Sequence, residues 1–304
     1  MSLLVVGSVA FDSIETPHGN VDDALGGSAS FFSVVASNFT KPRLVGVVGE
    51  DFPQEHKDLF KKKGIDISGL VTEKGKTFRW KGRYHKDMNT RDTLEVHLNV
   101  FGTFNPILPD HFKDSKFVFL ANSSPVVQAK VLDQVTKPDL VLADTMDLWI
   151  NIQKKELLEL LPRIDGLLLN DSEAMLLTGE SNLVRAGHAT RKLGPKFVIL
   201  KKGEHGALLF HEDQVFFAPA LPLEEVFDPT GAGDTFAGGF SGFIAQSENI
   251  SFGNMKNAII YGSNLASFCV EKFGTERMLT LEKEEVYDRL KQFRALTQFD
   301  IELE

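Results

Sequence analysis

A glycine-rich segment, DPTGAGDTFAGGF at residues 228–240, carries the most chemical information in the sequence. Gly231, Ala232 and Gly233 leave the peptide backbone uncovered where an apolar stretch of helical spacing begins, so several backbone N–H groups can converge on one anion. Asp234 follows directly, in the expected first helical turn, where the positive end of the helix dipole favours an ionised carboxylate. The segment is therefore suited to hold a phosphate beside an ionisable carboxyl group.

A carboxylate beside an anion cradle repels the anion, and this arrangement makes chemical sense when the carboxylate has a proton to remove. Phosphoryl transfer to an alcohol needs both groups, because the N–H groups stabilise charge on the migrating phosphoryl group while the carboxylate accepts the hydroxyl proton. We therefore interpret Asp234 as the catalytic base and the backbone N–H groups of residues 231–234, from Gly231 through Ala232 and Gly233 to Asp234, as the anion hole. The alternative is an ordinary glycine-rich helix start with Asp234 as a favourable first-turn residue.

Further polar residues follow short apolar runs elsewhere in the chain. Asp144 and Asn170 each end such a run, Glu173 comes one helical turn after Asn170, and Asp12 follows the first run after a turn. Ligands of open parallel sheets bind at the carboxyl ends of the strands, so these positions are site candidates. The alternatives are a solvated turn aspartate at Asp12 and an ordinary capped helix start at residues 170–173.

The apolar periodicity predicts a fold that brings strand ends together. Short β-rich runs alternate with segments of helical spacing, which is typical of βαβ units and a mostly parallel sheet. The expected strands are residues 3–7, 44–48, 117–121, 140–144, 166–170 and 197–201. The expected helices are residues 126–135, 152–161, 173–178 and 184–193, with a helical series at 228–245, 252–272 and 281–296.

One region breaks this alternation. Residues 72–104 are rich in Thr, Phe, Trp, Tyr and Val and contain turn-forming residues, as in antiparallel strands inserted between two βαβ units. Insertions of this kind usually form a flap over the strand ends or an oligomer contact. The alternative is a surface hairpin without a role.

The segment DPTGAGDTFAGGF closely resembles the C-terminal signature of the ribokinase-like (PfkB) family of carbohydrate and nucleoside kinases. The resemblance extends over most of the chain. It implies an ATP-dependent kinase with a doubly wound α/β fold, a mostly parallel central sheet of about eight strands, and a small inserted β lid. We therefore expect a single domain over residues 1–304, with the lid formed by residues 13–25 and 72–104.

The N-terminal part of the chain resembles the motifs with which this family binds the phosphate acceptor. GSVAFD resembles the first strand and the aspartate that binds substrate hydroxyls, here Asp12. LGGSASFFSVVAS resembles the N-terminal signature, in which Gly26 and Gly27 let the substrate approach the backbone. The chain departs from the family at Phe31, where asparagine is common. This change admits an apolar or aromatic group near the acceptor, although Phe31 also suits the buried face of a helix.

The resemblance implies nucleotide contacts as well. NDSE resembles the N-x-x-E motif, in which Asn170 and Glu173 organise Mg²⁺ around the ATP phosphates, Glu173 through water because Mg²⁺ retains several waters. In VILKKGEHGALLF, Lys201 is the candidate phosphate contact and Gly203 allows close approach of ATP. The remaining matches are Gly262, Asn264 and Gly274 near the adenine, and Asp228 with Thr230 as a site for a monovalent cation such as K⁺.

Composition narrows the function classes. The net charge of −9, from 42 acidic and 33 basic side chains, argues against a nucleic-acid binder. No run approaches the roughly 18 apolar residues of a membrane-spanning helix, and the N-terminus lacks a signal-peptide pattern, so we expect a cytoplasmic protein without a membrane partner. The single cysteine, Cys269, excludes an intrachain disulfide. Neither a P-loop nor a dinucleotide-binding fingerprint occurs, and no zinc-binding histidine pair is present.

The sequence therefore predicts an enzyme that moves the γ-phosphate of ATP to a hydroxyl of a sugar or polyol. The alternative within the same family is a nucleoside kinase, for which Phe31, Trp80 and Trp149 are candidate stacking residues. A ligand-binding protein that keeps the fold without catalysis is a remote alternative. The lid is also the candidate surface for a homodimer.

Overall fold

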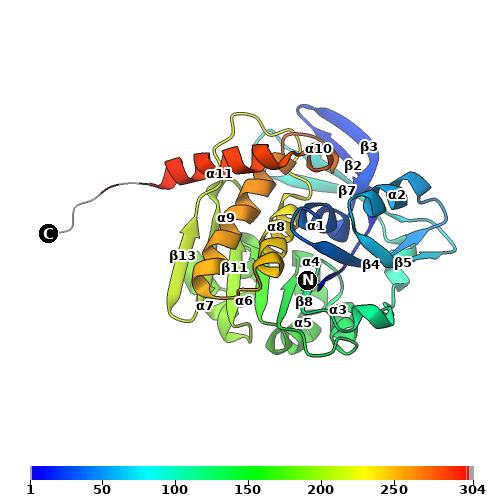
Figure 1. The fold of residues 1–304 in the computed structure, drawn as a ribbon, viewed down its shortest axis with the longest axis horizontal. Helices are drawn as coiled ribbons and strands as arrows, with labels where there is room; N and C mark the ends of the chain where they lie inside the picture. The colour runs from blue at the N-terminus through cyan, green and yellow to red at the C-terminus, as the bar shows by residue number, and fades with distance from the viewer. Residues whose placement is uncertain (1, 299, 301–304) are drawn as a thin grey trace.

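The computed structural model describes residues 2–298 and 300, and its centre is a nine-stranded sheet (Figure 1). From one edge to the other the strands are β13 (Gln214–Ala218), β12 (Ala207–His211), β11 (Phe197–Lys201), β10 (Gly166–Asn170), β9 (Leu140–Asp144), β8 (Phe117–Leu120), β1 (Ser2–Val6), β4 (Lys41–Gly49) and β5 (Asp66–Glu73). The strands from β11 to β5 run parallel, whereas β12 and β13 are antiparallel to their neighbours. The large sheet is thus mostly parallel, as the sequence predicts.

The central strands are buried on both faces and consist of continuous apolar residues, as in β1 and β8. Within the described residues the large sheet has one strand more than the expected eight. The strand ranges expected from apolar runs do not include β5, β12 or β13, and the turn at Glu212 and Asp213 pairs β13 with β12. Because β13 is an edge strand with mostly exposed side chains, its sequence lacks a buried apolar run.

Helices cover both faces of the large sheet, which makes the fold doubly wound. One core layer is formed by α1 (Ser28–Ala36), α2 (Gln54–Lys62), α8 (Ala232–Ser247), α9 (Phe252–Cys269) and α10 (Glu276–Thr280), with α11 (Lys283–Thr297) against α9 (Figure 1). The opposite layer is formed by α3 (Pro125–Leu132), α4 (Asp147–Ile152), α5 (Lys154–Leu160), α6 (Asp171–Thr178) and α7 (Leu183–Lys192). Short 3₁₀ turns are η1 (Asn99–Thr103), η2 (Asp110–Phe112), η3 (Leu161–Arg163) and η4 (Gly203–His205). The expected helix at residues 152–161 corresponds to α5, which is shorter at both ends because Gln153 before it has a non-helical φ of −135° and the chain continues into η3 at Leu161.

A second sheet of four strands, here called the small sheet, lies beside α1 (Figure 1). Its order is β3 (Gly19–Gly26), β2 (Ala10–Thr16), β6 (Phe78–Tyr84) and β7 (Arg91–His97). The sequence of β6, FRWKGRY, alternates with a period of two, so one face of the small sheet carries Trp80 and Tyr84 and the other carries basic residues.

The small sheet corresponds to the predicted insertion, with different boundaries. Its first hairpin begins at Ala10 and not at residue 13, and residues 72 and 73 belong to β5 in the large sheet. After β7 the chain returns to the core through η1, where Val100 is buried against the large sheet. The segment joins the two sheets, since Val100 and Phe104 are buried in the main core while Phe101 stacks on Phe78 of β6 at 5.4 Å.

No helix among the described residues is sufficiently long and apolar to cross a membrane.

Candidate active site

Helix α8 begins at the glycine-rich segment, and its first turn leaves two backbone donors available. Within the described residues, the N–H groups of Gly233 and Asp234 donate to no protein acceptor, whereas the N–H of Ala232 donates to the Pro229 carbonyl at 3.2 Å. The prediction that Ala232 also supplies a free donor is therefore wrong, because its N–H closes the turn before the helix. Gly233 and Asp234 present their N–H groups at the positive end of α8, where an anion is favoured.

Gly231 is required at the start of this turn for two separate reasons. It caps α8 in the left-handed conformation, with φ of +74°, and a β-carbon there would lie 2.5 Å from the ring of Phe31. Phe31 is buried in α1, so it forms the wall behind the turn. The residue predicted to contact the acceptor thus also fixes the position of the anion hole.

The carboxyl group of Asp234 lies in the first turn of α8 and is partly buried. Burial raises its pKa to about 7, and the negative charge of Asp144 acts in the same direction, while the positive charges of Lys201 and Arg91 oppose the shift. A base is most effective when its pKa lies near the working pH. The surroundings of Asp234 therefore suit it to accept a proton at neutral pH.

A cation lies directly against the anion hole. Lys201 ends β11, its Nζ forms a 2.9 Å ion pair with Asp144 at the end of β9, and the same Nζ would lie 3.1 Å from a β-carbon at Gly233. Burial alone would lower the pKa of Lys201, but the charge and hydrogen bond of Asp144, together with the charges of Glu173 and Asp234, outweigh burial and raise the pKa. Lys201 is thus held as an ammonium ion beside the two free N–H groups. Its partner Asp144 was expected at the site only as a strand-end residue.

Asn170 and Glu173 form a reciprocal cap at the start of α6. The Asn170 side chain accepts a hydrogen bond from the Glu173 N–H at 2.8 Å, and the Glu173 carboxylate accepts one from the Asn170 N–H at 2.7 Å. Burial raises the pKa of Glu173 to about 7, Asp144 adds to this, and Lys201 opposes it. Residues 170–173 are thus a capped helix start, and the same cap holds the oxygen atoms of Asn170 and Glu173 beside Lys201. The cap is therefore compatible with the predicted role in organising Mg²⁺.

The acceptor side is built around Asp12 on β2. Its carboxylate accepts a hydrogen bond from the Gly27 N–H at 3.3 Å and lies against Gly26, where a β-carbon would overlap it. Burial raises the pKa of Asp12 to about 7, and the Gly27 hydrogen bond opposes the shift. Gly26 therefore makes room for the carboxylate and Gly27 donates to it, with a φ of +90° and the backbone of Ser8 and Ala10 close to the position of an added β-carbon. The structure brings this carboxylate to the same end of the sheet as Asp234.

The inner face of the small sheet adds residues that the sequence did not identify. Tyr84 is buried and its hydroxyl shares a 3.2 Å hydrogen bond with the hydroxyl of Thr230. Arg91 lies opposite Tyr84 on β7, with its guanidinium 5.7 Å from the ring centre of Trp80. Its positive charge lowers the pKa of both Asp12 and Asp234. From the sequence alone, Arg91 at the start of a polar strand is not distinguishable from an ordinary solvent-exposed arginine. The side of the small sheet that it occupies follows from its pairing with Tyr84 on β6.

Asp228 and Thr230 fix the conformation of the loop that precedes Gly231 and α8. The Asp228 carboxylate is completely buried and accepts hydrogen bonds from the Thr230 N–H at 2.8 Å and from the Gly274 N–H at 2.9 Å. Burial raises the pKa of Asp228. The structure thus gives Gly274 a loop-pinning contact, and a role of these residues in nucleotide or cation binding stays a prediction.

The other nucleotide candidates divide into two groups. Gly203 starts η4, directly after β11, and lies close to Asn89 in the turn between β6 and β7. Gly262 lies at the crossing of α8 and α9, where a β-carbon would be 2.8 Å from the Phe236 carbonyl oxygen. Asn264 is buried and donates to the Val286 carbonyl in α11 at 3.2 Å. The structure therefore gives Gly262 and Asn264 packing roles.

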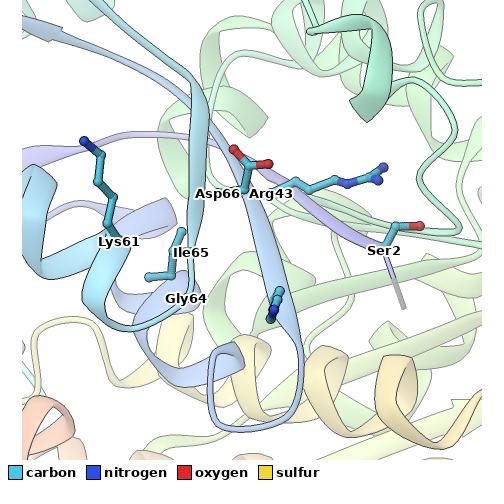
Figure 2. Close-up of a pocket in the computed structure, with 7 residues that line it drawn as sticks. Ser2, Arg43, Lys61, Gly64, Ile65 and Asp66 are labelled. Carbon is cyan, nitrogen blue, oxygen red and sulfur yellow. The ribbon is translucent and has the colours of Figure 1, made fainter.

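A surface pocket lies at the other end of the large sheet. Figure 2 shows this open pocket of about 650 Å³, lined by Ser2, Lys41, Arg43, Lys61, Gly64, Ile65 and Asp66. Its residues include the starts of β1, β4 and β5, so it lies at the amino ends of the parallel strands. The candidate site lies at the opposite, carboxyl ends, as expected for an open α/β sheet.

Comparisons with known proteins agree with this geometry. The cytidine kinase of Thermococcus kodakarensis is 32% identical over 79% of this chain and 87% of its own length, and the inositol 3-kinase of Arabidopsis thaliana is 26% identical over 95% and 81%. A ribokinase II candidate from E. coli in complex with ATP and Mg²⁺ has a TM-score of 0.80 at 19% identity, covering 96% of this chain and 99% of that one. The fold is thus ribokinase-like. Since the pfkB carbohydrate kinase family also matches residues 2–281, this chain belongs to that family.

Proposed function

We propose that this protein transfers the γ-phosphate of ATP to a hydroxyl of a sugar or polyol, with Asp234 as the general base. The observation that carries this proposal is the pairing of two unbonded N–H groups, on Gly233 and Asp234, with an ionisable carboxyl group in the same helical turn. In this proposal Asp234 accepts the hydroxyl proton as the acceptor oxygen bonds to the γ-phosphorus. The bond to the β–γ bridging oxygen breaks, and ADP leaves.

The residues around the cradle suit a nucleoside triphosphate and Mg²⁺. Lys201 would contact the phosphates, since its ammonium lies against Gly233 and a single carboxylate pairs with it. Asn170 and Glu173 offer oxygen atoms, the donor type that Mg²⁺ prefers, and Glu173 would act through water. Bound Mg²⁺ would neutralise developing charge on the phosphates. Gly203 and Gly274 remain the proposed backbone contacts of the nucleotide.

The acceptor would lie between Asp12 and Asp234 under the small sheet. A carboxylate that is buried beside Gly26 and Gly27 can accept hydrogen bonds from two hydroxyl groups, which suits a vicinal diol. A vicinal diol occurs in sugars, in ring polyols and in the ribose of a nucleoside. The similarity to the Arabidopsis inositol 3-kinase supports the polyol class.

A nucleoside is the second candidate acceptor, and one structural feature favours it. The indole of Trp80 lies across Gly82 on the inner face of the small sheet, where an added β-carbon would overlap the ring. A flat ring held in this way can stack on a base. The similarity to the Thermococcus cytidine kinase supports this candidate.

Two secondary proposals concern a cation and a partner. Asp228 and Thr230 would bind K⁺ through remaining oxygen lone pairs and would tie the ion to the cradle loop. The small sheet would pair with a second copy through β7, an edge strand whose side chains are all exposed, including Leu94 and Val96. Light scattering at several protein concentrations tests the dimer.

The decisive experiment is an ADP-release assay with Mg²⁺ over sugars, polyols and nucleosides, with and without K⁺. Acceptor-dependent ADP release that appears with one acceptor class and gives a phosphorylated product would support the proposal. Release that is independent of every acceptor, or binding of an acceptor without turnover, would contradict it. A K⁺ effect in the same screen tests the cation proposal separately.

A further inference from the structure

Tyr84 connects the two parts of the molecule that meet at the site. It is the last residue of β6 in the small sheet, it is 6% exposed, and its hydroxyl is hydrogen-bonded to Thr230 at 3.2 Å. Thr230 is also buried and directly precedes Gly231, the cap of α8. The hydroxyl of Tyr84 is therefore one residue away from the turn that forms the anion hole.

The segment that Tyr84 contacts is itself rigidly pinned. The Thr230 N–H donates to one carboxylate oxygen of Asp228 at 2.8 Å, and the Gly274 N–H donates to the other at 2.9 Å. A β-carbon at Gly274 would lie 3.3 Å from the β-carbon of Ala24 in β3. Both hairpins of the small sheet thus contact this unit, β2–β3 next to Gly274 and β6–β7 through Tyr84.

The same face of the small sheet points toward the acceptor. Tyr84 and Trp80 alternate with the outward-facing basic residues of β6, and Trp80 is paired with Asp12 on β2. A movement of this face toward or away from the acceptor would therefore also move the hydroxyl of Tyr84 relative to Thr230. The contact between Tyr84 and Thr230 thus links acceptor binding mechanically to residues 228–231, the loop that precedes α8.

We propose that Tyr84 is a positioning residue that couples closure of the small sheet over the acceptor to the geometry of the Gly231–Asp234 anion hole. The proposal rests on the proposed kinase function, and it gives a reason why the phosphoryl group is transferred to the acceptor and not to water. With the acceptor bound, the closed small sheet holds Thr230 and the two free N–H groups in place. Without the acceptor the same hydrogen bond forms but the small sheet is closed for only part of the time, so the two N–H groups are held less firmly and transfer of the phosphoryl group to water is slow.

The test uses Tyr84→Phe, Thr230→Val and the double variant, with Tyr287→Phe as the matched control. Tyr287 is 63% exposed on α11 and makes no contact with the site. Removing one buried hydroxyl partner is expected to lower kcat about tenfold, with a rise in the acceptor KM and a smaller change in the ATP KM. The ratio of acceptor phosphorylation to acceptor-independent ATP hydrolysis should fall by a similar factor. The double variant should be no worse than either single variant, within about twofold.

Thr230→Ser, which keeps the hydroxyl, should restore the kcat that Thr230→Val loses. Additive effects, in which the double variant falls about a hundredfold, would show that the two residues act separately and would overturn the proposal. An equal loss of kcat in all variants with unchanged KM values and an unchanged hydrolysis ratio would also overturn it, since this is the result of a role in folding alone.

Hydrogen exchange of the free protein separates this proposal from the kinase assignment, because it needs no turnover. The hydrogen-bonded backbone amides at residues 228–235 should exchange about tenfold faster in Tyr84→Phe than in wild type or Tyr287→Phe. These amides belong to Asp228, Thr230, Ala232 and Thr235. Unchanged exchange in this segment would refute the coupling even in an active kinase. Faster exchange in a protein that phosphorylates no acceptor would leave the coupling standing and would refute the proposed function.

Discussion

Asp234, the proposed general base, lies in surroundings that disfavour its ionised form. We predict that Asp234→Asn lowers kcat by about 10²–10⁴ while ATP and acceptor still bind, because the isosteric amide cannot accept the proton. Single-turnover kinetics and calorimetric titration measure the two effects. Near-normal turnover in this variant would remove Asp234 from the mechanism.

The same substitution should stabilise the protein at alkaline pH. The folded protein keeps the Asp234 proton up to about pH 7, whereas the unfolded chain releases it near the ordinary value of 3.8. The folded state therefore binds more protons between these values, and stability falls as pH rises through this window. Asp234→Asn should raise the free energy of unfolding at pH 8 by about 1–2 kcal/mol relative to wild type, with little difference at pH 3.5. Urea titrations at the two pH values provide the measurement.

The charges next to Asp234 should move the pH dependence of the rate in opposite directions. Activity needs the ionised base, so the rate rises with pH through about 7. Lys201 lowers the pKa of Asp234 and Asp144 raises it. Lys201→Met should therefore shift the rising limb of the pH–rate profile to higher pH, and Asp144→Asn should shift it to lower pH. Shifts of the same sign in both variants would contradict the electrostatic assignment.

Residues with a local signature were predicted from the sequence, and residues that act across the fold were not. Gly231, Gly233 and Asp234 lie in one continuous motif, and Asp12 follows a recognisable strand, so their proximity could be inferred from the pattern. Tyr84 and Arg91 reach the site from a sheet whose pairing is fixed only in three dimensions. Their residue types are ordinary for a polar strand, and the register of β6 and β7 is what turns them inward.

At the scale of elements, the first turn of α8 depends on contact between two helices. We predict that Gly231→Ala lowers stability by about 2–4 kcal/mol and abolishes most activity, because the new methyl group meets both an unfavourable φ and the ring of Phe31. Urea unfolding and kcat measure the two losses.

Gly179→Ala is the matched control for this prediction. Gly179 has a similar φ of +76°, but no atom lies within 4 Å of an added β-carbon. It should therefore show the backbone penalty alone, about 1 kcal/mol, without loss of activity. Equal destabilisation by the two substitutions would mean that Phe31 does not constrain the turn. Combining Gly231→Ala with Phe31→Leu should recover part of the stability difference.

The elements of the fold followed from apolar runs wherever both faces of a strand are buried. β13 has a half-exposed pattern, and the break between α4 and α5 falls at Gln153, a residue with no helix-breaking side chain. In both cases tertiary packing decides the local structure. Sequence patterns could therefore predict the layers of the fold but not its edges.

At the scale of the whole molecule, the single cysteine reports on opening of the core. Cys269 is completely buried in α9, and burial raises its pKa to about 12. We predict that a disulfide reagent such as DTNB labels the native protein at least about 10³-fold more slowly than the protein in guanidinium chloride, since reaction needs an opening of the α8–α9 layer. Saturating ATP should slow labelling further, because a ligand of the folded state stabilises it. Fast labelling of the native protein would mean that this layer opens locally.

The parallel pairing of β2 with β6 has a consequence for the order of assembly. Between these two strands the chain forms β3, which pairs with β2, and then α1, β4, α2 and β5, which belong to the main body. Bringing β2 and β6 together closes a long loop. The entropic cost of closing this loop is smaller once the intervening chain has folded. The proposed binding of an acceptor through Asp12 in β2 should thus be acquired late in folding, after the nascent chain has emerged beyond residue 84.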